Sequence, residues 1–161
     1  INKDKKNLFI FDVQPYREIF TTTWLNVYDQ YAYDAINAIK FLKDIVTASE
    51  DLNIKLYVKR KRNIGSLAHP AYLKILNKLY HNKKISLVDP KVNATNMIEK
   101  SNAVISMPFT STAHIAKELN IPSIFYDSSG LVKTDILQTH NIKFISDTNS
   151  LKKWLIMVFN N

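Results

Sequence analysis

Short apolar segments alternate with amphipathic segments along almost the whole chain. The apolar segments have the length of buried strands, and turn residues or charged residues bound them. Six of them predict strands: Asn7–Val13, Ile54–Val58, Ile85–Val88, Ala103–Met107, Ser123–Tyr126 and Phe144–Ile145.

The intervening segments carry apolar residues at helical spacing. The longest is Tyr31–Leu52, in which Ala38, Leu42 and Ile45 recur every three or four positions. Pro70 suits the first turn of a helix, because its missing N–H would have no intrahelical partner there. Further helices are expected after a cap at Asn93, after a cap at Ser111 or Thr112, and at Leu151–Phe159, whereas Pro15–Gln30 is expected to be an ordered loop.

Strands and helices therefore alternate with short connections. Continuous apolar strands are typical of a sheet that helices cover on both faces. The sequence predicts an α/β fold, a doubly wound, Rossmann-like parallel sheet of about six strands, formed by residues 1–161 as a single domain. Ligands bind such sheets at the carboxyl ends of the strands, so the loops after the strands are the places to seek function.

Composition narrows the classes of function. The chain has 161 residues, no cysteine and only two glycines. Disulfide scaffolds, thiolate metal sites, Walker loops and GxGxxG loops are therefore excluded. The four histidines are scattered without metal-ligand spacing, so we expect neither a metal nor a bound cofactor. No apolar run approaches the ~20 residues of a membrane-spanning helix.

The net charge of +8 favours an anionic partner, either a nucleic acid, a phosphate-bearing small molecule or an acidic membrane surface. A solvated lysine-rich surface is the plainer alternative. The chain does not begin with Met and enters a strand almost at once. We therefore expect a fragment of a longer protein.

Candidate anion ligands follow the second predicted strand. Lys59-Arg60-Lys61-Arg62 places four cations together, and a bound anion would relieve their mutual repulsion. His69 falls near the N-cap of the next helix, where it could donate to a phosphate oxygen beside the positive end of the helix. The alternatives are a solvated basic loop and a local capping histidine.

Hydroxyl residues follow the fourth predicted strand, in Pro108–Ala113. Hydroxyls and backbone N–H groups at a helix start can hold a phosphate, although Ser and Thr also cap ordinary helices. Asp127 follows the fifth strand, where it could bind a ribose or sugar hydroxyl or cap a turn.

Leu56–Gly130 resembles the C-terminal, donor-binding domain of GT-B glycosyltransferases, and in particular that of bacterial surface-carbohydrate and capsule polysaccharide biosynthesis proteins. Four pieces carry the likeness: YVKRKR at Tyr57–Arg62, AHP at Ala68–Pro70, the long segment Ser86–Asp127, and IFDVQPYRE at Ile10–Glu18. AHP is similar to the His-Pro motif of GT-B sialyltransferases and Kdo transferases. In those families this motif contacts the CMP phosphate.

The resemblance implies that His69, Ser111 and Thr112 bind the donor phosphate and that Lys59 and Lys61 neutralise it. It favours a CMP-linked sugar over a UDP- or GDP-linked one. Two family features are missing: Pro108–Ala113 holds no carboxylate of an E-x7-E donor motif, and no D/E-D/E-G motif supplies a catalytic base.

The resemblance also implies a metal-independent transfer. Its catalytic base would lie in an absent N-terminal domain, so we expect the chain to bind a nucleotide sugar without transferring the sugar alone. The acceptor would be a glycan or a lipid-linked glycan. The implied location is the cytoplasm, with peripheral association at the inner face of the membrane, where basic residues suit anionic lipid.

Three rivals stay open. A non-hydrolysing UDP-sugar epimerase would share the architecture, but Asp127 and His114 are poor candidates for its carboxylate and histidine. A basic nucleic-acid-binding α/β module fits the charge, yet the sequence lacks a helix-long basic stripe or an aromatic stacking platform, so we expect no nucleic-acid partner. The third is a scaffolding half that no longer binds a donor.

Overall fold

The computed structural model describes residues 6–17, 34–60, 63–133 and 139–160. They form a six-stranded parallel sheet with the order β3-β2-β1-β4-β5-β6. The strands are β1 (Asn7–Asp12), β2 (Lys55–Arg60), β3 (Ser86–Val88), β4 (Ala103–Ser106), β5 (Ser123–Tyr126) and β6 (Lys143–Ile145). This is the doubly wound, Rossmann-like arrangement that the alternating pattern predicts.

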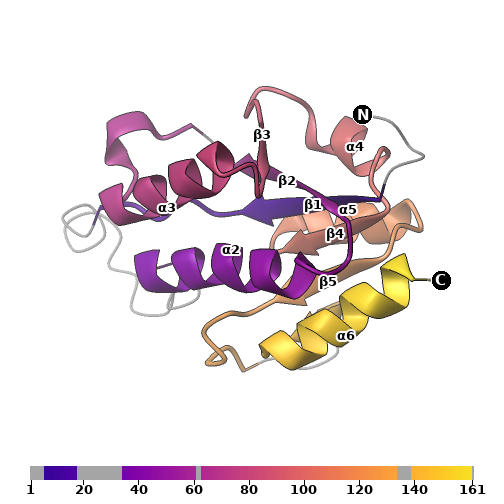
Figure 1. Ribbon diagram of the computed structural model, residues 1–161. Coiled ribbons are helices and arrows are strands. Elements are labelled where there is room, and N and C mark those ends of the chain that lie inside the picture. Colours follow the sequence, from indigo (N-terminus) through magenta and orange to yellow (C-terminus); the bar gives the residue numbers. More distant parts are fainter. Residues whose placement is uncertain (1–5, 18–33, 61–62, 134–138, 161) are drawn as a thin grey trace.

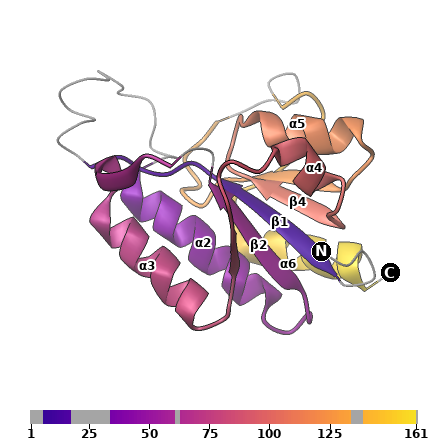
Figure 2. The ribbon, with the colours of Figure 1, turned by 90° about the horizontal axis from the view of Figure 1, so that it is seen from above.

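Helices cover both faces of the sheet. They are α2 (Ala35–Ser49), α3 (Pro70–His81), α4 (Ala94–Ile98), α5 (Ser111–Glu118) and α6 (Thr148–Phe159), with a short 3-10 turn, η3 (Gly65–Leu67). The helices α2, α3 and α6 lie on one face (Figure 1). Seen from above, α4 and α5 lie on the other face (Figure 2). None of the helices in the described ranges is long and apolar enough to cross a membrane.

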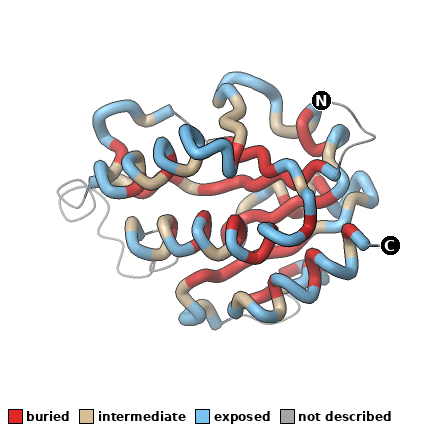
Figure 3. Tube along the Cα trace, in the orientation of Figure 1, coloured by how far each residue is buried: buried red, intermediate tan, exposed pale blue. Residues whose placement is uncertain are grey.

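The central strand β1 carries the core of both layers. Leu8 and Ile10 pack into the α2, α3 and α6 layer, while Phe9 and Phe11 pack into the α4 and α5 layer. The Phe9 ring stacks on Tyr57 of β2 at a centroid distance of 4.8 Å. The central strands β1, β4 and β5 consequently form a buried layer (Figure 3), which explains why they are mostly apolar in sequence.

Several element boundaries differ from the prediction, among them those of β2, α5 and α6. Strand β2 continues beyond Val58 through Arg60, because its pairing with β1 extends to the last residue of β1. Helix α5 has Thr110 at its N-cap position, one residue before the predicted caps. Helix α6 starts at Thr148, because the Asp147 side chain caps it.

The predicted helix over Tyr31–Leu52 is confirmed as α2, which is shorter at both ends. It begins after Asp34, whose carboxylate accepts a hydrogen bond from the backbone N–H of Asn37. Most of the predicted Pro15–Gln30 loop lies outside the described residues, and so do Lys61 and Arg62.

Candidate functional site

The topological switch point of the sheet lies at the carboxyl end of β1. Strand β1 stands between β2 and β4, and the chain leaves these two neighbours toward opposite faces, into α3 and α5 (Figure 2). Doubly wound sheets bind ligands at this position. It is at the left of the sheet in Figure 1.

Residues 13–17, which follow β1, connect the loops on its two sides. The backbone N–H of Val13 contacts the sulfur of Met107 at 3.2 Å. On the other side, the N–H of His69 donates to the carbonyl of Pro15 at 2.8 Å and the N–H of Arg17 to that of Leu67 at 3.0 Å. The two motifs that sequence analysis singled out, around His69 and around Ser111, are therefore held against one short segment.

His69 occupies the N-cap position of α3, as predicted. Its Nδ1 accepts a hydrogen bond from the backbone N–H of Ala71 at 3.3 Å. An accepting Nδ1 carries no proton, so in the neutral ring the proton is on Nε2. The half-buried imidazole thus caps the helix with one nitrogen and retains a donor on the other.

The start of α5 lacks a side-chain cap. Thr110 is at the N-cap position, but its hydroxyl donates to the carbonyl of Met107 at 2.8 Å. The hydroxyl of Thr112 lies 2.8 Å from that of Ser106, whereas Ser111 is exposed. Because the Thr110 side chain makes no capping bond to the first N–H groups of α5, these groups are open to another hydrogen-bond acceptor.

Lys59 is directed into the structure. Its side chain is buried, and its amine donates to the carbonyl of Pro90 at 3.0 Å. Burial lowers the pKa of Lys59, and the nearby Asp89 carboxylate partly opposes this. The amine therefore braces the loop between β3 and α4. Its predicted part in neutralising a donor phosphate stays a prediction, and Lys61 lies outside the described residues.

Asp127 organises its own loop. One carboxylate oxygen accepts hydrogen bonds from the backbone N–H and the hydroxyl of Ser129, at 2.9 Å and 2.5 Å. The other accepts from the backbone N–H of Val132 at 3.0 Å. Both oxygens are therefore engaged within the loop after β5. The predicted contact of Asp127 with a sugar hydroxyl stays a prediction.

His114 lies within α5, three residues after Ser111. Its ring packs edge-on against Phe125 and His140, at centroid distances of 5.6 Å and 5.1 Å. Burial, together with the nearby His140, lowers its pKa. This favours a packed, neutral ring. Across the described parts of the chain, no three His, Asp or Glu side chains are grouped so that they could hold a metal ion.

Two polar side chains at the end of β1, Asp12 and Gln14, were missing from the predicted site, and Arg60 at the end of β2 was predicted only as part of the basic run. Asp12 is buried and accepts a hydrogen bond from the hydroxyl of Tyr72 in α3. Burial raises the pKa of Asp12 to about 6, against the opposing effects of the Tyr72 hydrogen bond and the Arg60 charge. Gln14 is buried as well, and Arg60 is half-buried.

Strand alternation is the signal that would have found Arg60. In the KRKR run, alternate side chains point to opposite faces, so Lys59 and Arg60 cannot share a face. Register then pairs Arg60 with Asp12. The sequence holds both residues, but it does not state which strands are neighbours.

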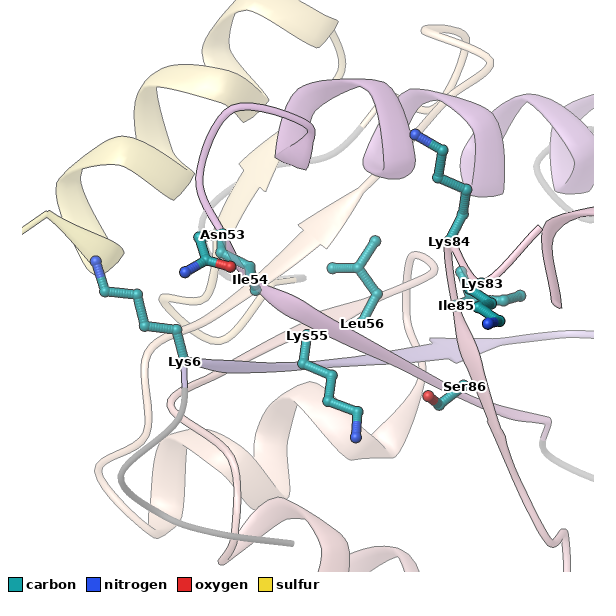
Figure 4. A pocket seen from close by; sticks show the side chains of 9 residues that line it. All are labelled: Lys6, Asn53, Ile54, Lys55, Leu56, Lys83, Lys84, Ile85 and Ser86. Atoms are coloured by element: carbon teal, nitrogen blue, oxygen red, sulfur yellow. The ribbon is translucent and has the colours of Figure 1, made fainter.

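A hollow lies at the opposite, amino edge of the sheet. It has a volume of about 610 Å³, and four lysines line it, Lys6, Lys55, Lys83 and Lys84. Figure 4 shows that Lys6 points toward α6 and Lys84 toward α2. There they bond the carbonyl of Phe159 and the carboxylate of Glu50. Lys55 lies over the ring of Tyr57. The cations diverge, so this hollow lacks a converging anion site.

The sheet order and the switch-point loops define a Rossmann-like α/β domain. The chain belongs to the family described as polysaccharide biosynthesis PFTS motif protein, whose model matches residues 1–155. The letters of that motif occur here as Pro108-Phe109-Thr110-Ser111. They form the turn from β4 into α5, at the candidate site.

The solved structures that resemble this chain include two enzymes. The UDP-GlcNAc 2-epimerase from Methanocaldococcus jannaschii has 17% identity and a TM-score of 0.55, over 100% of this chain and 39% of that one. The KpsC beta Kdo 2,4 transferase of Thermosulfurimonas dismutans has 10% identity and a TM-score of 0.49, over 78% of this chain and 35% of that one. The chain thus spans less than two fifths of either protein. No curated protein sequence matches it.

Proposed function

We propose that this chain is the nucleotide-sugar donor-binding domain of a glycosyltransferase in bacterial surface polysaccharide biosynthesis. The donor is a CMP-linked sugar in preference to a UDP- or GDP-linked one. Transfer needs no metal, and its catalytic base lies outside these residues. Membership of a polysaccharide biosynthesis family supports the pathway, and the GT-B-type fold is compatible with the domain's role.

One observation carries the proposal. The helices α3 and α5 both begin at the end of β1, and residues 13–17 hold the two starts together through the bonds to His69 and Met107. Helix α5 offers uncapped N–H groups and the exposed Ser111, while His69 offers its Nε2 proton. A phosphate placed between them would receive hydrogen bonds from both sides, as well as the positive ends of two helix dipoles.

The same groups suit the chemistry of transfer. When the bond between sugar and phosphate breaks, negative charge grows on the departing nucleotide. Donors fixed in advance stabilise this charge without reorganising. His69 and the first turn of α5 would hold the phosphate oxygens. The acceptor, a glycan or lipid-linked glycan, would approach from residues outside this chain, at the inner face of the membrane.

The direct test is calorimetric titration of the purified chain with CMP, UDP and GDP. We expect one nucleotide, CMP, to bind best. His69→Ala and Ser111→Ala should each weaken binding by about ten- to a hundred-fold, the range of one lost hydrogen bond to a charged group. Asn149→Ala is the matched control, since Asn149 is an exposed polar residue in the first turn of α6, which Asp147 already caps.

The outcomes separate the candidate functions. Tightest binding of UDP would redirect the donor assignment, and conversion of UDP-GlcNAc to its 2-epimer by the chain would favour the epimerase rival. Binding that His69→Ala and Ser111→Ala leave unchanged would reject the site. Sugar transfer by the isolated chain would contradict the expectation that the base lies elsewhere.

A further inference from the structure

Among the described residues, four buried side-chain atoms at one place in the fold have no hydrogen-bond partner. They are Oδ1 of Asp12, Nε2 and Oε1 of Gln14, and Nε of Arg60. The three residues stand at the carboxyl ends of the adjacent strands β1 and β2. We call Asp12, Gln14 and Arg60 the orphan cluster.

Hydrogen bonds within the fold fix the position of the orphan cluster. Asp12 and Arg60 are register partners in the parallel pairing of β1 with β2. Gln14 lies between Val13, which contacts Met107, and Pro15, which holds His69. The cluster is therefore next to the proposed phosphate position. Arg60 is half-buried, so one side of the cluster reaches the surface.

Unpartnered buried polar atoms are rare in native proteins, because each forfeits its hydrogen bonds to water. A single such atom can be accidental. Four of them on three residues, beside a switch point, indicate groups kept available for a ligand. The contrast with Ser128 is informative: it is also buried at this edge, yet its hydroxyl donates to the carbonyl of Asn37 at 2.7 Å.

The chemistry of the cluster indicates which part of a ligand it fits. Arg60 Nε and Gln14 Nε2 are donors, whereas Asp12 Oδ1 and Gln14 Oε1 are acceptors when Asp12 is ionised. A phosphate offers only acceptors and would be repelled by the Asp12 carboxylate. Sugar hydroxyls both donate and accept, so neighbouring hydroxyls match an amide and a carboxylate together.

We propose that the orphan cluster binds hydroxyl groups of the sugar in the donor, and that Gln14 makes the central hydrogen bonds to them. This inference rests on the proposed function, because it takes the phosphate position from there. In a nucleotide sugar the sugar is bonded directly to a phosphate, so a phosphate held by His69 and α5 brings the sugar to the neighbouring strand ends. The sequence motifs place Arg60 only in a basic run of general anion ligands, and neither they nor the family description assigns a role to Asp12 or Gln14.

The test compares each nucleotide with its own sugar conjugate: CMP with CMP-N-acetylneuraminate, UDP with UDP-N-acetylglucosamine, and GDP with GDP-mannose. Calorimetry on the full 161-residue chain gives the ratio of Kd between Gln14→Leu and the unmodified chain. For the conjugate that binds best, we expect Gln14→Leu to raise Kd about ten-fold, as for the loss of one or two hydrogen bonds. For the free nucleotide, the change should be less than about two-fold.

Thermal unfolding of the free variants supplies a second readout. Gln14→Leu removes two unpartnered polar atoms, so its midpoint should equal or exceed that of the unmodified chain. Gln14→Met serves if the leucine variant does not fold. Ser128→Ala is the matched control. We expect it to lower the midpoint of thermal unfolding and to change the Kd of the nucleotide and of its conjugate equally.

Each remaining outcome is decisive. Equal loss of affinity for nucleotide and conjugate, or loss for neither, overturns the sugar assignment while the donor domain stands. An effect of Gln14→Leu only on an acceptor glycan also overturns it. If the unmodified chain binds no nucleotide at all, the proposed function fails first, and the sugar site fails with it.

Discussion

Two aspartates at the carboxyl edge of the sheet differ in how fully the protein uses them. Asp127 follows β5 and Asp12 ends β1, and both are at most 2% exposed. The carboxylate of Asp127 accepts three hydrogen bonds from its own loop. Asp12 accepts one, from Tyr72, and its second oxygen has no partner. Position and burial are alike, but the number of donors around each carboxylate is not.

The carboxyl edge of the sheet therefore has two parts. In the structural half, around β5, the buried polar groups are hydrogen-bonded, whereas in the unsatisfied half, around β1 and β2, several of them are not. Around β5, the polar groups stabilise a loop. Around β1 and β2, burial of the polar groups costs desolvation free energy that hydrogen bonds in the described residues do not offset. A ligand site is the simplest reason for tolerating that cost, and three measurements can break or sharpen the contrast.

The largest effect is expected from Asp127→Ala. The substitution leaves two backbone N–H groups, of Ser129 and Val132, without their acceptor. Hydrogen bonds to a charged group contribute about 1.5–3 kcal/mol each, so the free energy of unfolding should fall by about 3–4 kcal/mol. Urea unfolding followed by circular dichroism measures it.

Asp89→Ala is the control for this measurement. Asp89 is exposed and accepts a single backbone bond, from Lys91 at 2.8 Å, so its loss should cost about 1 kcal/mol or less. If Asp127→Ala were as mild as Asp89→Ala, the loop would not depend on its aspartate. The contrast between the two halves of the edge would then collapse.

The second effect concerns the pH dependence of stability at Asp12. Its pKa is raised from 3.8 to about 6 by burial, so between these values the folded state binds the proton that the unfolded state releases. Stability from this group is complete below about pH 4 and is lost as the pH rises through about 6, by about 2–3 kcal/mol. Asp12→Asn cannot titrate, so its stability relative to the unmodified chain should improve by that amount between pH 4 and pH 7.

Urea unfolding of both proteins across this pH range makes the measurement. A difference in unfolding free energy that stays constant with pH would show that Asp12 is not held in an unfavourable ionised state. Asp147→Asn is a control of opposite sign. The backbone N–H of Ser150 lowers the pKa of Asp147, so the stability that Asp147 contributes is lost as the pH falls below about 4.

The order and type of elements could be predicted because burial on both faces leaves a direct record in sequence. The strand Ser123–Tyr126 was predicted with the bounds it has. His69 was placed at a cap because proline follows it, and the N-cap is confirmed. These inferences depend only on residues that are close together in the sequence.

The orphan cluster could not be predicted, because it depends on neighbours in space. Asp12 and Arg60 are 48 positions apart and meet only through the β1–β2 register. The sequence also does not show whether a polar side chain is free to bind a ligand. The sequence left open whether Asp127 binds a sugar hydroxyl or caps a turn, and only the structure shows its carboxylate bonded within its loop. Lys59 was predicted as a cation for a phosphate, and only the structure shows its amine on the carbonyl of Pro90.

The smallest effect is expected at Phe109, in the turn between the two halves. Its φ is +58°, a left-handed conformation that costs an L-residue roughly 1–2 kcal/mol and glycine almost nothing. Its ring is 48% exposed and meets Phe125 and Phe144 at centroid distances of 6.1 Å and 6.4 Å. Phe109→Gly therefore relieves backbone strain while losing about half of an aromatic burial, about 1–1.5 kcal/mol.

Glycine also adds about 0.5–1 kcal/mol of chain entropy to the unfolded state. The three contributions nearly cancel, so urea unfolding should show a change within about 1 kcal/mol. Phe125→Ala is the comparison, because Phe125 is fully buried and its loss should cost about 3–5 kcal/mol. A loss at Phe109 as large as at Phe125 would mean that the turn is part of the structural half of the edge. A small loss of unfolding free energy would mean that fold stability does not explain the conformation of the turn, just as it does not explain the orphan cluster.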